Sequence, residues 1–400
     1  MSELLWQALQ GIEGFVYPNE VEINWSVLIA LYPYITGLVA GAFIVASLER
    51  VFKVEAVKPT YRLALLTALA FLIAAPLPLV AHLGHPERAF EIMMTPHLTS
   101  AMAGFGFIYL WYLLVVLCLE IWFDYRKNIV EWSETTTGIR KLIYTILTLG
   151  VKDISKEAVK SDERIVYAIT LIGLPSAVFL HGYVGFIFGS VKANPWWASP
   201  LMPIIFLFSA VVSGISLLIL LYMSISKIRR VPIDMKCLDT LGAYLLYAFI
   251  LDFGLEAMEI VHMLYLKEES IDMIIRLITD KLFISFIVIQ IALGTFLPLI
   301  LLGIARTKIL GELGRKAIYL ISSVLILIAV FAMRWNVVIG GQILSKSLRG
   351  FSVYNLPLFT REGALMAIAI FALPFIILYI LVKILPPWEE GPPWKHENEG

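Results

Sequence analysis

The stretch His82–Ser100, HLGHPERAFEIMMTPHLTS, lies between two long apolar runs of the chain. It contains three histidines, one arginine, two glutamates and two prolines. Two apolar runs joined by a polar, turn-rich segment indicate two membrane-spanning helices that meet at a membrane surface. A connection between spans rarely has this composition, so we expect this surface to carry chemistry.

The composition of the whole chain predicts the same class of protein. Hydrophobic residues make up 60% of the sequence, charged residues 16%, and the mean hydropathy is +0.84. Soluble domains contain about 25% charged residues. We therefore expect an all-α integral membrane protein with about nine transmembrane helices, at 25–49, 61–82, 99–123, 165–189, 200–225, 238–264, 281–305, 316–342 and 362–385.

The distribution of basic residues predicts how these helices are oriented. Of the 31 lysines and arginines, 22 fall on one side of the spans and eight on the other, and Arg334 lies within a span. Basic residues are retained on the cytoplasmic side. The N-terminus is therefore expected outside and the C-terminus inside, with the His82–Ser100 segment on the outer face.

The order of the spans predicts two four-helix bundles followed by a C-terminal helix. A short amphipathic piece, Ile139–Leu149, is expected on the membrane surface. Trp196 and Trp197 are expected to be interface anchors, and Gly37 and Gly41 to allow close helix packing. The predicted units are an outer segment 1–24, a first bundle 25–190 with outer loop 82–100 and inner loop 124–164, a second bundle 191–345, and a helix with inner tail 346–400.

Ionisable residues within the spans are candidates for function, because burying them in hydrocarbon is costly. Asp252, Glu256, Glu259 and His262 follow one another at intervals of four, three and three residues, which predicts one helical stripe. Arg334 is expected at the depth of Glu256, so a charge pair between them is possible. The stripe could transfer protons, or it could be a structural ion-pair network.

Several motifs resemble the polysulfide reductase membrane-subunit (NrfD/PsrC) family, over roughly residues 25–345. They occur in the family's order and spacing. The tail YNLPLFTREGALM, which is followed by one more span, resembles the longer branch of that family. That branch includes hydrogenase and sulfur-metabolism complexes. The motifs are IALYPYITGLVAGAF, HLGHPERAF with TPHLTSAM, HGYVGFIFGSVKANPWWASPLMPIIFLFSAVVSG, and RWNVVIGGQ.

The resemblance implies a subunit of the cytoplasmic membrane that binds a menaquinone-like quinone. It also implies a ferredoxin-like iron–sulfur partner on the outer face and a catalytic subunit with molybdopterin or nickel–iron. No haem, iron–sulfur cluster or other metal is expected in this chain, and no nucleic acid partner. His82 stands where many relatives have aspartate. The family's quinone site carries over onto His82, Gly84, Arg88, Ser100, Tyr183, Asn24 and Trp25.

Three other functions were weighed against this interpretation. A di-haem cytochrome needs paired axial histidines, and only His181 and His262 lie clearly within spans. An ion-coupled secondary transporter also suits buried charges, but we find no inverted repeat. A passive membrane anchor would not need the buried charges. The terminal substrate is not encoded in this chain, because that chemistry belongs to the expected partner.

Overall fold

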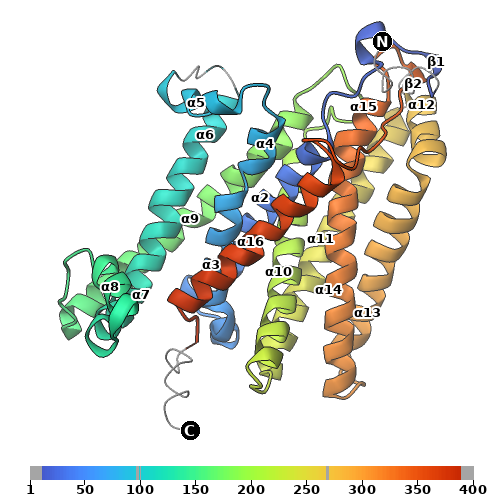
Figure 1. The fold of residues 1–400 in the computed structure, drawn as a ribbon. Helices are drawn as coiled ribbons and strands as arrows, with labels where there is room; N and C mark the ends of the chain where they lie inside the picture. Colours follow the sequence, from blue (N-terminus) through green and yellow to red (C-terminus); the bar gives the residue numbers. More distant parts are fainter. Residues whose placement is uncertain (1–10, 96–98, 100, 267–269, 389–400) are drawn as a thin grey trace.

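The computed structural model describes residues 11–95, 99, 101–266 and 270–388 of the chain. Within these residues nine helices are long and apolar enough to cross a membrane, which confirms the predicted number. They run between two ends of the molecule (Figure 1), an upper end with α5 and both strands and a lower end with α8. The spans are α2 (Val27–Arg50), α3 (Lys58–Ala74) with α4 (Leu77–His82), α6 (Ala101–Trp111) with η4 (Tyr112–Cys118) and α7 (Leu119–Thr135), α9 (Lys156–Gly189), α10 (Met202–Ile228), α11 (Met235–Leu266), η6 (Phe283–Phe296) with α13 (Leu297–Arg306), α14 (Glu312–Trp335) with η7 (Asn336–Gly340) and α15 (Gly341–Ile343), and α16 (Ala364–Ile384).

A two-stranded antiparallel sheet at the upper end was not predicted. Strand β1 pairs with β2, with Glu13 opposite Phe351, and Lys281 Nζ lies 2.5 Å from Glu13 Oε1. The segment before the first span is therefore attached to the segment after the eighth. The shorter elements are β1 (Glu13–Phe15), η1 (Pro18–Glu20), η2 (Glu55–Val57), η3 (Pro86–Arg88), α5 (Glu91–Met94), α8 (Gly138–Leu147), α12 (Ile271–Arg276), η5 (Leu277–Lys281) and β2 (Arg349–Phe351).

Helix α2 lies at the centre of the bundle. Nearly all of its residues are buried, and it packs against α3, α9, α10 and α14. A Cβ on Gly41 would lie 2.1 Å from the carbonyl oxygen of Ala210 and 2.8 Å from Cα of Gly214, so the backbones of α2 and α10 are in contact. A Cβ on Gly37 would lie 3.1 Å from Cε1 of His181. The predicted close packing at both glycines is confirmed.

The predicted division near residue 190 places the spans in two groups. The first group is α2, α3, α6 to α7 and α9, and the second is α10, α11, η6 with α13, and α14. Helix α16 packs on α3 and α2 (Figure 1). However, α2 packs at least as extensively on α10 as on any single helix of its own group. The division into two bundles near residue 190 therefore stays a prediction, as does the orientation of the chain.

The loop expected at 124–164 is shorter than predicted, because both flanking helices continue beyond their apolar parts. Helix α7 runs to Thr135 and α9 begins at Lys156. Arg126 donates to Oδ2 of Asp162 at 2.7 Å, and this buried ion pair joins the two polar extensions. The predicted amphipathic piece forms α8, with Ile139, Leu142 and Ile146 exposed along one side.

Trp196 and Trp197 are not interface anchors, since both indole rings are buried in the bundle. Segment η7 is a π-helix, whose altered hydrogen-bond spacing changes which carbonyl groups need a donor. Trp196 Nε1 donates to the carbonyl oxygen of Asn336 at 2.9 Å, and Trp197 Nε1 to that of Val337 at 2.6 Å. The two tryptophans therefore stabilise the end of the eighth span.

We expect Trp197→Phe to lower the free energy of unfolding by about 1–3 kcal/mol, because the buried Val337 carbonyl loses its side-chain donor. Titration with dodecyl sulfate in mixed micelles measures this change. Trp335→Phe is the matched control, because its indole N–H donates no hydrogen bond in the described part of the chain. Equal losses in both variants would show that the Val337 contact contributes nothing.

Candidate buried charge centre and quinone site

A buried arginine forms the centre of the polar interior. Arg334 of α14 is 0% exposed, and its guanidinium lies 3.8 Å from the centroid of the Phe206 ring. It donates to Oγ of Ser209 at 2.6 Å and to the carbonyl oxygen of Phe206 at 3.2 Å, both on α10. Nε2 of His181, from α9, lies 3.1 Å from the same guanidinium nitrogen. The cation is therefore held by neutral groups from two other spans.

The tautomer of His181 follows from these contacts. An arginine can only donate, so Nε2 of His181 must carry the lone pair and Nδ1 the proton. Nδ1 lies 3.4 Å from Oγ1 of Thr36, which itself donates to the carbonyl oxygen of Tyr32 at 3.1 Å. We call Thr36, His181, Ser209 and Arg334 the Arg334 centre. It joins α2, α9, α10 and α14 at one place.

The predicted acidic stripe lies on α11 and becomes more exposed toward the upper end. Asp252 is 3% exposed, Glu256 and Glu259 are half-buried, and His262 is exposed. Asp252 Oδ1 and Glu259 Oε2 are buried without a hydrogen-bond partner. A charged group without a hydrogen-bond partner is costly to bury in a membrane span.

The direct charge pair between Arg334 and Glu256 is not formed. Among the ion pairs in the described part of the chain, none includes Arg334. Asp252 and Glu256 nevertheless lie near enough to interact with its charge. Arg334 and Glu256 lie near each other, as their equal depth predicted, but they form no ion pair. The guanidinium bonds instead to the Ser209 hydroxyl and the Phe206 carbonyl oxygen of α10.

Glu256 belongs instead to a chain of side-chain hydrogen bonds. It accepts from Nε2 of Gln290 at 3.2 Å, whose Oε1 accepts from Nδ2 of Asn336 at 2.8 Å. Asn336 Oδ1 accepts from Oγ of Ser285 at 2.6 Å. A cavity of about 70 Å³ adjoins this chain and is also lined by Glu259. This arrangement connects Glu256, the one member that readily binds and releases a proton, to three neutral polar side chains.

The sequence analysis missed Gln290, Asn336 and Ser209, because only ionisable residues within spans were taken as candidates. An amide inside the apolar run FISFIVIQIALGTF is itself a signal, since it too is costly to bury. The sequence indicates only that His181 lies within a span, and the structure brings it to Arg334. No group of three or more metal-ligating side chains is found within the described ranges.

The predicted quinone residues at the upper end lie in different surroundings. His82 is half-buried, and its Nδ1 lies 2.8 Å from Oε2 of Glu362. Arg88 is exposed and donates two hydrogen bonds of 2.8 Å to Glu91, which lower the pKa of the Glu91 carboxyl. Gly84 and Asn24 are exposed, and Ser100 lies outside the described residues. Two described residues of this loop bond to the segment before α16: His82 to Glu362, and the Leu83 carbonyl oxygen, which accepts from Arg361 at 2.8 Å.

Trp25 and Tyr183 lie deeper than the loop. The Trp25 ring stacks on Trp197 with centroids 5.4 Å apart and meets the edge of Phe188 at 5.9 Å. Phe188 in turn packs on Phe206, so Trp25 is linked through aromatic rings to the Arg334 centre. Tyr183 interacts electrostatically with Tyr32. A Cβ on Gly104 of α6 would lie 3.4 Å from the hydroxyl oxygen of Tyr183.

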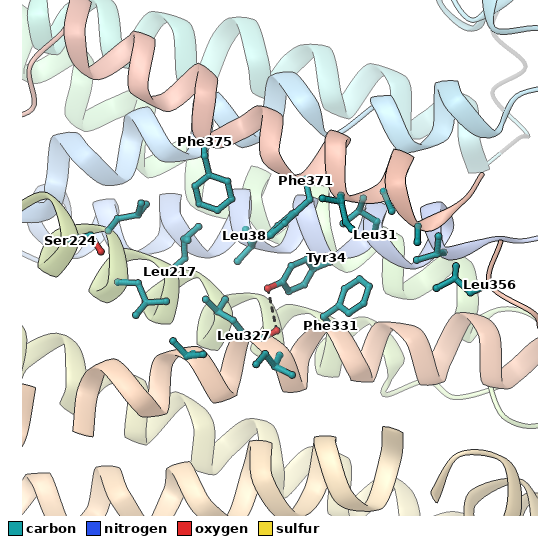
Figure 2. Close-up of a pocket in the computed structure, with 18 residues that line it drawn as sticks. Leu31, Tyr34, Leu38, Leu217, Ser224, Leu327, Phe331, Leu356, Phe371 and Phe375 are labelled. Atoms are coloured by element: carbon teal, nitrogen blue, oxygen red, sulfur yellow. Dashed lines mark hydrogen bonds between the residues drawn. The ribbon is translucent and has the colours of Figure 1, made fainter. Parts of the chain in front are cut away.

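An apolar groove of about 720 Å³ lies between α2, α10, α14 and α16 (Figure 2). Tyr34 points into it and donates to the carbonyl oxygen of Leu327 at 3.2 Å. Apart from Tyr34 and Ser224, its lining is entirely apolar. Val27 and Ala364 belong to the lining. Val27 lies two residues after Trp25 in the chain, and Ala364 lies two residues after Glu362. The upper end of the groove is therefore close to Trp25 and Glu362 along the chain, although neither side chain lines it.

The fold and these sites define a multi-pass helical membrane protein with charges buried in its interior. The chain belongs to the family described as polysulphide reductase, NrfD, whose model matches residues 17–345. Three relatives are a subunit of selenate reductase from Mesobacillus selenatarsenatis (30% identical, 79% of this chain, 73% of the relative), an Hdr-like menaquinol oxidoreductase integral membrane subunit from Archaeoglobus fulgidus (24%, 94% and 89%), and protein NrfD from Escherichia coli (27%, 48% and 57%).

Proposed function

We propose that this chain is the quinone-interacting membrane subunit of a multi-subunit oxidoreductase. The match to the NrfD family over residues 17–345 carries the proposal. The similarity to a menaquinol oxidoreductase integral membrane subunit over 94% of the chain supports menaquinone or a related quinone. In this role the subunit exchanges electrons between the membrane quinone and a partner subunit.

The upper end of the bundle is the proposed place of the quinone ring. The His82–Glu362 pair can donate or accept a proton at a quinone carbonyl, since imidazole and carboxyl groups both exchange protons. Trp25 offers an aromatic face nearby. The groove between α2, α10, α14 and α16 has the apolar lining and the size suited to an isoprenoid tail. Tyr183, on α9, is proposed as a further hydrogen-bond donor to the ring.

The proposed proton-transfer residues are Asp252, Glu256, Glu259, His262 and Arg334. Reduction of a quinone takes up two electrons and two protons, so a route for protons must reach the ring. The gradient of burial along α11 and the hydrogen-bond chain from Glu256 to Asn336 support transfer between the Arg334 centre and the upper end. Arg334 would act by its charge, because its proton is not released.

The proposed partners are an iron–sulfur subunit at the upper end and a catalytic subunit with molybdopterin or nickel–iron. The curated relatives named as subunits of selenate reductase and of a menaquinol oxidoreductase support assembly into a complex. The exposed loop with Arg88 and the β1–β2 sheet offer a polar docking surface there. The cytoplasmic membrane is the proposed location.

The test is purification of the chain in mild detergent with its copurifying subunits, followed by extraction and identification of bound quinone. We expect His82→Ala and Tyr183→Phe each to reduce recovered quinone about tenfold, the effect of losing one charge-assisted or buried hydrogen bond. His85→Ala is the matched control for the loop, because His85 is exposed and contacts only Glu87 two residues away.

Tyr265→Phe is the control for the tyrosine, since that side chain is 86% exposed. Recovery of an iron–sulfur partner together with quinone would support the whole proposal. Stoichiometric haem absorbance from this chain alone would contradict it. Absence of both quinone and partner, with stabilisation by a small ion, would favour an ion-coupled transporter.

A further inference from the structure

A buried glutamate in the lower half of the bundle takes no part in the proposed quinone site. Glu120 of α7 is 0% exposed, and its Oε2 has no hydrogen-bond partner. Its Oε1 lies 2.7 Å from Oγ1 of Thr170 and 3.4 Å from the hydroxyl of Tyr61. An ionised carboxylate with a bare oxygen inside a membrane span is strongly disfavoured.

The cations near Glu120 are already paired with a different carboxylate. Arg50 and Arg62 both bond to Asp124, one helical turn below Glu120, and the distance for Arg62 is 2.8 Å. Arg50 also donates to the Tyr61 hydroxyl at 3.2 Å. The charged and titratable groups that face Glu120 are thus Arg50 of α2, Tyr61 of α3, Asp124 of α7 and Tyr112 of η4. None of them forms an ion pair with it in the described structure.

The hydroxyl of Thr170 is placed for a protonated Glu120. Its single hydrogen has two acceptors, the Val166 carbonyl oxygen at 2.8 Å and Glu120 Oε1 at 2.7 Å. When Thr170 donates to Val166, its oxygen can accept a hydrogen from a neutral Glu120 carboxyl. Both contacts are then satisfied at once.

A polar cavity of about 370 Å³ opens at the lower end beside this carboxyl. It is lined by charged side chains that include Arg50, Arg62 and Asp124, and also by Tyr61. A polar cavity of this size holds several water molecules. Tyr61 therefore borders the cavity on one side and bonds to Glu120 on the other.

We propose that Glu120 is a proton-exchange site, which binds and releases one proton through Tyr61 and the lower-end cavity. On loading, the Tyr61 O–H bond breaks as an O–H bond forms on Glu120. A hydronium ion in the cavity restores the Tyr61 hydroxyl and becomes water. No electron moves. The distribution of basic residues predicts that this cavity faces the cytoplasm. Glu120 would then exchange protons with the side of the membrane opposite to the proposed quinone site.

Infrared spectra of the purified protein in liposomes test this proposal. Among the carbonyl bands of protonated carboxyls, one is expected at neutral pH that shifts in D2O and is missing in Glu120→Gln, whereas a band from the buried Asp252 carboxyl would stay. Glutamine keeps the size and the Thr170 contact, so this variant should fold. Glu163→Gln is the matched control, because Glu163 is exposed and lines the same cavity. An unchanged band in Glu120→Gln would overturn the proposal.

The route is tested by the rate of hydrogen exchange. We expect Tyr61→Phe to retain the band but to slow its shift in D2O about 10-fold or more, because a proton carrier is lost. An unchanged rate would exclude Tyr61 as the route. Thr170→Val provides a second measurement. The carbonyl band should move to higher frequency, because the Glu120 carboxyl loses its hydrogen bond to Thr170. No turnover is measured, so these outcomes are independent of the quinone experiment.

Discussion

Arg334→Met is expected to abolish quinone-linked electron transfer and to lower the free energy of unfolding by about 3 kcal/mol or more. The substitution leaves Ser209, His181 and the Phe206 carbonyl without their shared donor. It also removes the positive charge that interacts with Asp252 and Glu256. Methionine keeps much of the volume of the side chain, so the loss reports charge and hydrogen bonding more than packing.

Quinone reductase turnover of the purified complex and dodecyl sulfate titration measure the two effects. Arg164→Met is the matched control, because Arg164 is exposed on α9. A double variant tests the electrostatic part. Arg334→Met combined with Asp252→Asn should recover part of the stability, because the unneutralised acid is removed. Additive losses in the double variant would show that the two residues act independently.

Gly41→Ala is the second substitution with a large expected effect. The new methyl group would lie 2.1 Å from the Ala210 carbonyl oxygen, so α2 and α10 must move apart. Backbone atoms cannot rotate away as a side chain can, and overpacking of this kind costs about 1–3 kcal/mol. Because α2 contacts five other spans, α9 among them, the shift also displaces Thr36 and Gly37 from His181. We expect lower stability together with loss of bound quinone.

Gly303→Ala is the matched control, since nothing lies within 4 Å of a Cβ built there. That variant should gain about 0.5–1 kcal/mol, because alanine favours the helix more than glycine does. Both changes are measured by dodecyl sulfate titration and by size-exclusion chromatography. A Gly41→Ala protein as stable as the parent would mean that the close approach of α2 and α10 is not required.

Much of the fold was predictable because one physical constraint governs it. Apolar runs of membrane length must be helices, since their backbone groups find no water to bond. The nine spans follow from that rule. The ends of α7 and α9 did not follow from it, because their polar extensions are stabilised by the Arg126–Asp162 pair and not by lipid. The small β1–β2 sheet depends on segments more than 300 residues apart.

The candidate sites were predicted only in part. Arg334 and the stripe from Asp252 to His262 stand out in the sequence, because charges in apolar runs are conspicuous. Their partners do not, because serine, glutamine and asparagine are individually unremarkable. The roles of Trp196 and Trp197 were mistaken for the same reason, since an indole suits both a membrane interface and a buried carbonyl.

By itself, the sequence determined that this chain is a helical membrane protein and which ionisable residues fall within its spans. Hydrophobic length and the cost of burying charge are local properties, so they can be read along the chain. Only the tertiary structure decided what those groups contact. It places Arg334 on His181 and Ser209, leaves Glu120 with Thr170 and Tyr61, and opens the apolar groove between α2, α10, α14 and α16. These contacts depend on which helix faces pack together, and packing is a property of the whole bundle.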